Sequence, residues 1–73
     1  MSDPIDAIGL LCPLPVLRLR KRMRALASGE TITLIADDPA AVIDVPHFCA
    51  EAGHRLLEVC EQNGATHYTV QKA

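Results

Sequence analysis

The chain changes from strand to helix within ten residues, DAIGLLCPLP at positions 6–15. A short strand over residues 4–8 is expected to end at Gly9, because glycine commonly interrupts a strand. Pro13 and Pro15 lack backbone N–H groups and fix φ, so both are tolerated only in the first turn of a helix or just before it. Because the residue before a proline avoids helical geometry, the sequence leaves open which of the two prolines begins the helix.

The helix that follows is expected to run to Ser28, with Gly29 as its C-terminal cap. Its apolar residues recur at helical spacing and form one face of the helix. They are Val16, Leu19, Met23 and Leu26. Residues 30–36 then predict a strand, since nearly all of them are β-branched or aliphatic.

The sequence Asp-Asp-Pro breaks that strand, and Asp38 can cap a helical turn that begins with Pro39. Pro46 is costly deep inside a helix, so we expect a short turn first and then a second helix from near Asp44 to Gly53. Its predicted buried stripe consists of Val45, Phe48, Cys49 and Ala52.

The C-terminal part of the chain predicts two strands, residues 55–61 and 66–72, around an Asn63-Gly64 turn. The residues expected to face one another across this hairpin are Leu57 and Val59 on the first strand and Tyr68 and Val70 on the second. Two amphipathic helices need a surface against which to bury their apolar stripes. The predicted fold is therefore an α/β (α+β) two-layer sandwich of order β-α-β-α-β-β, in which a four-stranded mixed sheet carries both helices on one face. Residues 1–73 are expected to form this single domain.

The 73 residues include three cysteines, carry a formal net charge of −2 and contain only 3% aromatic residues. An acidic chain with few aromatic side chains for base stacking is not typical of a general nucleic-acid binder. Its apolar runs are shorter than the roughly 20 residues of a membrane span, and its acidic N-terminus is unlike a signal peptide. An odd number of cysteines argues against a secreted disulfide scaffold. We therefore expect a reduced, cytoplasmic protein that is monomeric by default and makes no direct membrane contact.

Cys12 is the cysteine whose surroundings indicate chemistry. It is expected at the start of the first helix, where free amides and the helix dipole favour an anion and lower the pKa of a thiol. A basic cluster on the same helix adds positive potential, namely Arg18, Arg20, Lys21, Arg22 and Arg24. We therefore expect Cys12 to be an exposed nucleophile with a lowered pKa. Cys49 is expected in the core, and Cys60 on a strand facing outward with nothing nearby to activate it.

Other uses of the Cys12 thiol fit the sequence less well. Pro15 occupies the place that a second cysteine takes in a Cys-x-x-Cys redox motif. The candidate zinc ligands are Cys12, His47, Cys49 and His54, and their spacing matches no standard zinc motif, so neither a metal nor a cofactor is expected. A thiolate with no resolving cysteine and no evident base is suited to carrying sulfane sulfur as a persulfide.

Several motifs along the chain match one family. They are Gly9-Leu10-x-Cys12-Pro13-x-Pro15, Arg20-Lys21, Gly29-Glu30-Thr31, Ile35-Ala36-Asp37-Asp38-Pro39-Ala40, Asp44-Val45-Pro46, Phe48-Cys49 and His54. On these residues the chain resembles the TusA/SirA family of small sulfur-carrier proteins over nearly its whole length. The resemblance implies the same two-layer fold and a persulfide on Cys12, with Gly9, Pro13 and Pro15 supporting the active loop.

The resemblance also implies partners and a destination for the sulfur. A cysteine desulfurase, a rhodanese or a DsrE-like protein would donate sulfur to Cys12, and the next protein of a relay would receive it. One destination in the family is 2-thiolation of the wobble uridine in certain tRNAs, where nucleic acid is reached only through the tRNA-thiolating partner. Sulfur oxidation and molybdenum-cofactor supply are the alternatives that use the same cysteine. Such a carrier is only weakly an enzyme, since it is itself a substrate of its partners.

The charged residues near the active loop allow two interpretations. An arginine-rich helix face is ordinarily just solvated, and here Arg18, Lys21 and Arg22 are candidates for docking an acidic partner surface. Asp37 and Asp38 are expected to form the turn and the helix cap at the strand end, and the resemblance adds contact with partners. The three histidines, which we expect to be structural or exposed rather than catalytic, are His47, His54 and His67.

Two positions depart from the family pattern. Ile8 and Leu11 stand where members often carry charged residues, so positive charge near Cys12 is reduced. Two other function classes stay open, an RNA-binding module that uses the basic helix and an interaction domain with an idle thiol. Replacing Cys12 by serine separates the three, because only the sulfur carrier predicts complete loss of function with folding intact.

Overall fold

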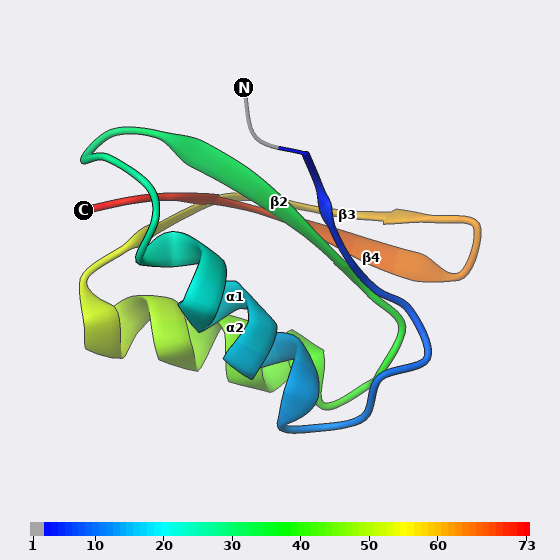
Figure 1. Cartoon of the computed structure of the whole chain (residues 1–73). Coiled ribbons are helices and arrows are strands. Elements are labelled where there is room, and N and C mark those ends of the chain that lie inside the picture. The colour runs from blue at the N-terminus through cyan, green and yellow to red at the C-terminus, as the bar shows by residue number, and fades with distance from the viewer. Residues whose placement is uncertain (1–2) are drawn as a thin grey trace.

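A computed structural model describes residues 3–73, which form two helices and one four-stranded mixed sheet (Figure 1). The elements in chain order are β1 (Ile5–Ala7), α1 (Leu14–Met23), β2 (Thr31–Ala36), α2 (Ala41–Ala52), β3 (Arg55–Gln62) and β4 (Ala65–Gln71). The sheet order is β1-β2-β4-β3, with β1 parallel to β2 and the other two pairs antiparallel. The predicted fold is confirmed.

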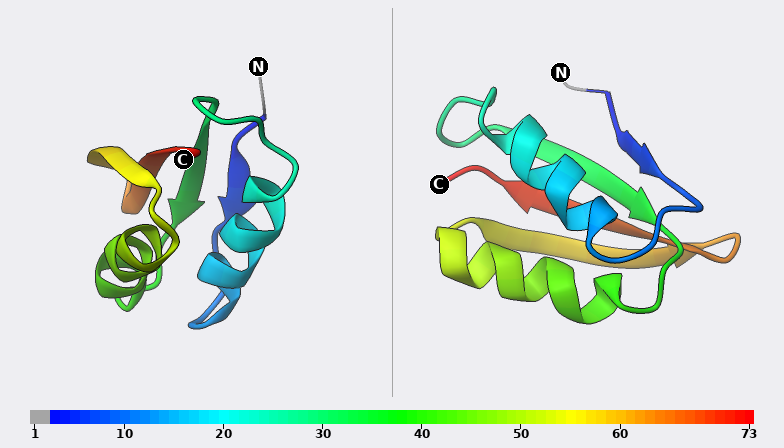
Figure 2. Two further views of the ribbon diagram at one scale, coloured as in Figure 1. Left: turned by 90° about the vertical axis from the view of Figure 1, so that its left-hand side faces the viewer. Right: turned by 60° about the horizontal axis from the view of Figure 1, so that its bottom comes forward.

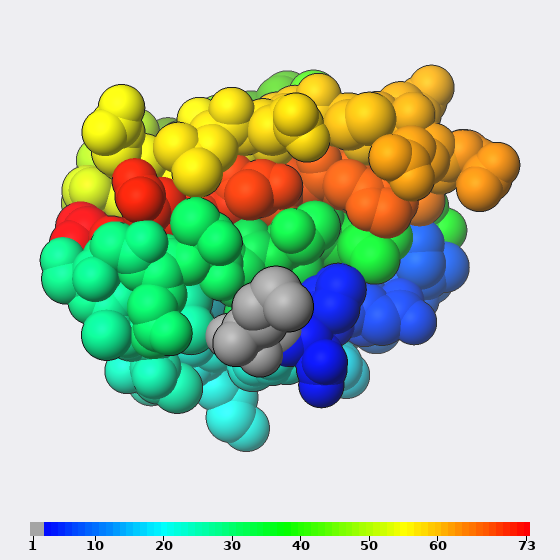
Figure 3. All heavy atoms as spheres, turned by 90° about the horizontal axis from the view of Figure 1, so that it is seen from above, coloured from blue at the N-terminus to red at the C-terminus, as the bar shows by residue number. Residues whose placement is uncertain are grey.

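Both helices cover the same face of the sheet, and the two views of Figure 2 show this layering from the end and from below. The core between the layers is almost entirely aliphatic, because Phe48 and Tyr68 are its only aromatic members. Its buried residues are Ile5, Ala7, Leu19, Met23, Ile32, Leu34, Ala36, Ala41, Val45, Phe48, Cys49, Tyr68 and Val70. The other face of the sheet is open to solvent, with the four strands lying side by side across it (Figure 3).

The first helix is shorter than expected, since α1 ends at Met23 rather than at Ser28. Beyond Met23 the chain forms a tighter turn than an α-helix, because the amide of Leu26 donates to the carbonyl of Met23, three rather than four residues earlier. The amide of Ala27 donates to the carboxylate of Glu30 instead of continuing the helix. Gly29 then donates to the carbonyl of Lys72 in the segment after β4, which draws residues 24–30 toward the sheet.

The second helix is longer than expected, because α2 begins at Ala41 and contains Pro46. Proline at this position removes only the bond to the carbonyl of Val42, four residues earlier. Val42 lies in the exposed first turn, where water can replace that bond. The end at Gly53 is confirmed, with a left-handed φ of 80° that favours glycine.

In the β3–β4 hairpin, the start of β3 is as predicted, and its end and both ends of β4 each differ from the prediction by one residue. Val59 faces Tyr68 as expected, but Leu56 rather than Leu57 lies opposite Val70. An irregularity between Leu56 and Glu58 shifts the register and leaves Leu57 exposed. Neither helix within residues 3–73 is long and apolar enough to cross a membrane.

Candidate active site

Cys12 lies in the loop between β1 and α1, and its side chain is exposed. Its backbone amide donates a hydrogen bond of 2.7 Å to Asp38 Oδ2. Earlier in the same loop, the amide of Gly9 donates to Asp37 Oδ1 at 2.9 Å. Because β1 and β2 are parallel, their C-terminal ends lie at one edge of the sheet, which brings the two aspartates beneath the loop.

Asp38 therefore does more than the sequence predicted. Its Oδ1 accepts a hydrogen bond of 3.3 Å from the amide of Ala40, so the expected cap is present. Its other oxygen holds the backbone of Cys12, 26 residues away in sequence. One side chain thus holds both the turn of residues 39–40, which precedes α2, and the backbone of Cys12.

The structure resolves which proline begins the helix. Pro13 is the N-cap residue, Leu14 is the first helical residue, and Pro15 lies buried in the first turn. Gly9 turns the chain out of β1 with a φ of +81°, in the left-handed region that side chains rarely adopt. The three supporting residues predicted for the loop, Gly9, Pro13 and Pro15, all lie in this entry to α1.

The thiol opens onto a groove between α1 and α2 with a volume of about 170 Å³. Residues spaced three and four apart on α2 line one wall, which places them on one face of that helix. They are Asp44, His47, Phe48 and Glu51. His47 Nε2 lies 2.9 Å from Glu51 Oε1. His47 was expected to be structural or exposed; it is exposed, and it also lies in the groove of Cys12, which the sequence alone did not reveal.

The expectation of a lowered Cys12 pKa is wrong. A hydrogen bond to Asp44 raises the pKa of the Cys12 thiol above its ordinary value, and desolvation and the negative charges of Asp44 and Asp38 add to the effect. These carboxylates therefore favour the protonated thiol over the thiolate.

The helix start does not compensate for these carboxylates. Pro13 and Pro15 have no amide hydrogen to offer, and the amide of Leu14 donates to the carbonyl of Leu11. The first turn therefore has few free donors with which to stabilise a thiolate. The same prolines that rigidify the loop remove the amides on which the expectation relied.

The basic cluster on α1 divides between two sides of the helix. Arg18, Lys21 and Arg22 line a hollow with Ile5 of β1, away from Cys12. Arg20 lines the Cys12 groove, and its guanidinium lies 5.4 Å from the centroid of the Phe48 ring. Arg24 lies one turn beyond Arg20 and lines the continuation of the same side.

The remaining cysteines lie elsewhere. Cys49 is buried in the core, as expected, and burial raises the pKa of its thiol. Cys60 is partly exposed on β3, where it pairs with His67 on the outer face of the sheet. Its sulfur accepts a hydrogen bond from Gln62 Nε2 at 3.7 Å. The Cys12 thiol opens into a groove beside charged side chains.

Comparison with known proteins places this geometry in a family. The family model described as sulfurtransferase TusA matches residues 4–72. The chain is 41% identical to the sulfur carrier protein TusA of Allochromatium vinosum over 72 residues, which cover 99% of this chain and 95% of that protein. The crystal structure of a SirA-like protein from Desulfitobacterium hafniense superimposes with a TM-score of 0.84 at 28% identity, covering 93% of each chain. The chain belongs to the TusA family of sulfur carrier proteins.

Proposed function

We propose that this protein carries sulfane sulfur as a persulfide on Cys12. The observation that carries the proposal is the exposed Cys12 thiol at the mouth of the groove, with its backbone held by Asp38. An exposed thiol on a fixed loop can reach the sulfur of a second protein, whereas the buried Cys49 cannot. The sulfur-carrier family of the chain supports the same reading.

The transfer balances without an external oxidant or reductant. The sulfur of Cys12 attacks the terminal sulfur of a donor persulfide, and a new S–S bond forms on Cys12. The S–S bond of the donor breaks, and the donor cysteine leaves as a thiol that receives the proton lost by Cys12. The reverse exchange with an acceptor thiol hands the sulfur on and restores Cys12.

The raised pKa of Cys12 favours the protonated thiol over the thiolate. The thiolate is the nucleophile, so the Cys12 proton must leave before or during attack. Asp44 hydrogen-bonds to the thiol and lies in the same groove.

The proposed donors are a cysteine desulfurase, a rhodanese or a DsrE-like protein, and the proposed destination is 2-thiouridine in tRNA, reached through a thiolating partner in the cytoplasm. The test is the 2-thiouridine content of tRNA from cells that lack this gene and are complemented with wild type, Cys12→Ser or Cys60→Ser. Wild type and Cys60→Ser should restore the nucleoside, and Cys12→Ser should not. If deletion of the gene leaves 2-thiouridine unchanged, the tRNA destination is wrong.

Docking of an acidic partner by Arg18, Lys21 and Arg22, with contacts to Asp37 and Asp38, stays a prediction from the sequence. The structure gives the two groups different surroundings. The three basic residues line the hollow beside β1, while the aspartates lie beneath the active loop. Charge reversal at Arg18, Lys21 and Arg22 should weaken donor binding and leave Cys12 alkylation unchanged, if this surface docks the partner.

A further inference from the structure

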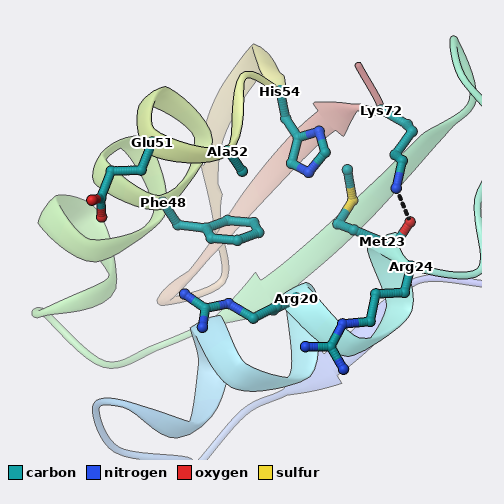
Figure 4. A pocket seen from close by; sticks show the side chains of 8 residues that line it. All are labelled: Arg20, Met23, Arg24, Phe48, Glu51, Ala52, His54 and Lys72. Carbon is teal, nitrogen blue, oxygen red and sulfur yellow. Dashed lines mark hydrogen bonds between the residues drawn. The ribbon is translucent and has the colours of Figure 1, made fainter.

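A second hollow of about 360 Å³ lies between α1 and the C-terminal part of α2 (Figure 4). Three residues, Arg20, Phe48 and Glu51, line both this hollow and the Cys12 groove. The two hollows are therefore parts of one continuous groove that leads from the thiol toward the end of β4. We call the part beyond Arg20 the basic groove; its charged residues are Arg20, Arg24, Glu51 and Lys72.

The positive charges of the basic groove have no carboxylate partner in the structure. Among residues 3–73 no carboxylate lies within ion-pair distance of Arg20, Arg24 or Lys72, and Glu51, the acid that lines the groove, lies 2.9 Å from His47 Nε2. Figure 4 shows Arg20 and Arg24 extending from α1 toward the hollow, with Lys72 entering from the end of β4. Lys72 Nζ donates to the carbonyl of Met23 at 2.9 Å, which anchors the ammonium and leaves its other hydrogens free.

The basic groove is unusual for this chain as a whole. The protein has a net charge of −2, yet three of its seven lysine and arginine residues gather here from two elements. Three cations against the single carboxylate of Glu51 leave a net positive potential that attracts an anion. His54 adds no charge of its own at neutral pH, because burial and Lys72 lower its pKa.

The form of the groove indicates a protein ligand rather than a small molecule. Arg20 and Arg24 are exposed at its rim, whereas a small-molecule site usually encloses most of its ligand. The floor is apolar, with the buried side chains of Met23 and Phe48. An extended segment with carboxylates at the rim and an apolar side chain on the floor matches both features.

We propose that the basic groove binds an acidic segment of the protein that exchanges sulfur with Cys12, with its carboxylates on Arg20, Arg24 and Lys72. The inference rests on the proposed sulfur transfer, because the continuous groove places a docked segment beside the thiol. Charge complementarity of this kind acts mainly on association rate and partner choice. It would position the donor persulfide without any contact to the reacting atoms.

The experiment measures sulfur loading of Cys12 at increasing concentrations of wild type and variants. The donors are a cysteine desulfurase with L-cysteine, a rhodanese with thiosulfate and a persulfidated DsrE-like protein. Arg24 is the residue to change, because it lines the basic groove and not the Cys12 groove. Arg24→Glu should raise the KM of the active donor enzyme for this protein about tenfold, and Arg24→Gln should raise it by a smaller factor. The rate of Cys12 alkylation by iodoacetamide should stay the same in both variants.

Arg55→Glu is the matched control, since it makes the same change of charge on the outer face of the sheet. Its KM should equal that of wild type, and added salt should abolish the difference between wild type and Arg24→Glu. Arg22→Glu tests the hollow beside β1 with the same change on the same helix. An Arg24→Glu KM equal to that of Arg55→Glu overturns the inference. If wild type loads from no donor, the proposed function fails and the inference fails with it.

Discussion

At the scale of single residues, the site is a thiol held among carboxylates. The amide of Cys12 donates a hydrogen bond to Asp38, and the Asp44 side chain raises the pKa of its thiol. Both acids disfavour the thiolate, so the structure keeps the nucleophile protonated. The sequence predicted the exposed cysteine correctly and the direction of its pKa wrongly. The error arose because Asp38 and Asp44 reach Cys12 only through the fold.

Asp44→Asn should lower the pKa of the Cys12 thiol. The variant removes the negative charge that stabilises the protonated form, so the thiolate fraction rises at every pH below the wild-type pKa. The rate of alkylation by iodoacetamide, measured from pH 6 to 10, should follow a curve displaced to lower pH and be faster at pH 7. Glu58→Gln, which removes an exposed charge on β3, should leave the curve in place. An unchanged or higher midpoint for Asp44→Asn would show that Asp44 does not hold the proton.

At the scale of elements, the parallel pairing of β1 and β2 builds the site. It brings the loop before α1 and the aspartates after β2 to one edge of the sheet. Periodicity and turn residues predicted every element, because each depends on neighbouring positions. The end of α1 depends on more distant partners, such as the bond from Gly29 to Lys72, and was missed, as was the start of α2. The pairing of Cys12 with Asp38 was missed for the same reason.

Asp38→Ala should destabilise the fold and loosen the active loop. It removes the hydrogen bonds to the amides of Cys12 and Ala40 at once. Loss of the bond that caps the turn before α2 and of the charge-assisted bond to Cys12 together costs about 1–3 kcal/mol of the free energy of unfolding. Urea denaturation measures that loss, and hydrogen exchange should show faster exchange at the amide of Cys12. Glu58→Ala should change neither, and protection of the Cys12 amide in Asp38→Ala would contradict this role.

At the scale of the whole molecule, two helices on one face of a sheet create the groove that carries the function. The apolar stripes of the helices identified most of the core, since Leu19, Met23, Val45, Phe48 and Cys49 are all buried. Ala52, which was expected in the buried stripe of the second helix, is exposed. The sequence could not show how the basic residues of α1 divide around the helix. That division depends on where β1 and α2 lie on either side of α1, and it separates the hollow beside β1 from the basic groove.

Leu19→Ala should test the packing of the two layers. Leu19 is fully buried in the core, and its truncation should lower the free energy of unfolding by about 2–5 kcal/mol. Leu17→Ala on the exposed side of the same helix should cost less than about 1 kcal/mol. Chemical denaturation of both variants measures the difference. Equal losses would mean that α1 does not pack on the sheet through Leu19.

The most direct test of the sulfur-carrier account is the intact mass of the protein after incubation with a sulfur donor. Wild type, Cys49→Ser and Cys60→Ser should each gain one sulfur, about 32 Da, that a reducing agent removes. Cys12→Ser should keep its unmodified mass while its circular dichroism matches that of wild type. A gain of sulfur in Cys12→Ser, or none in wild type with desulfurase, rhodanese and DsrE-like donors alike, would contradict the account.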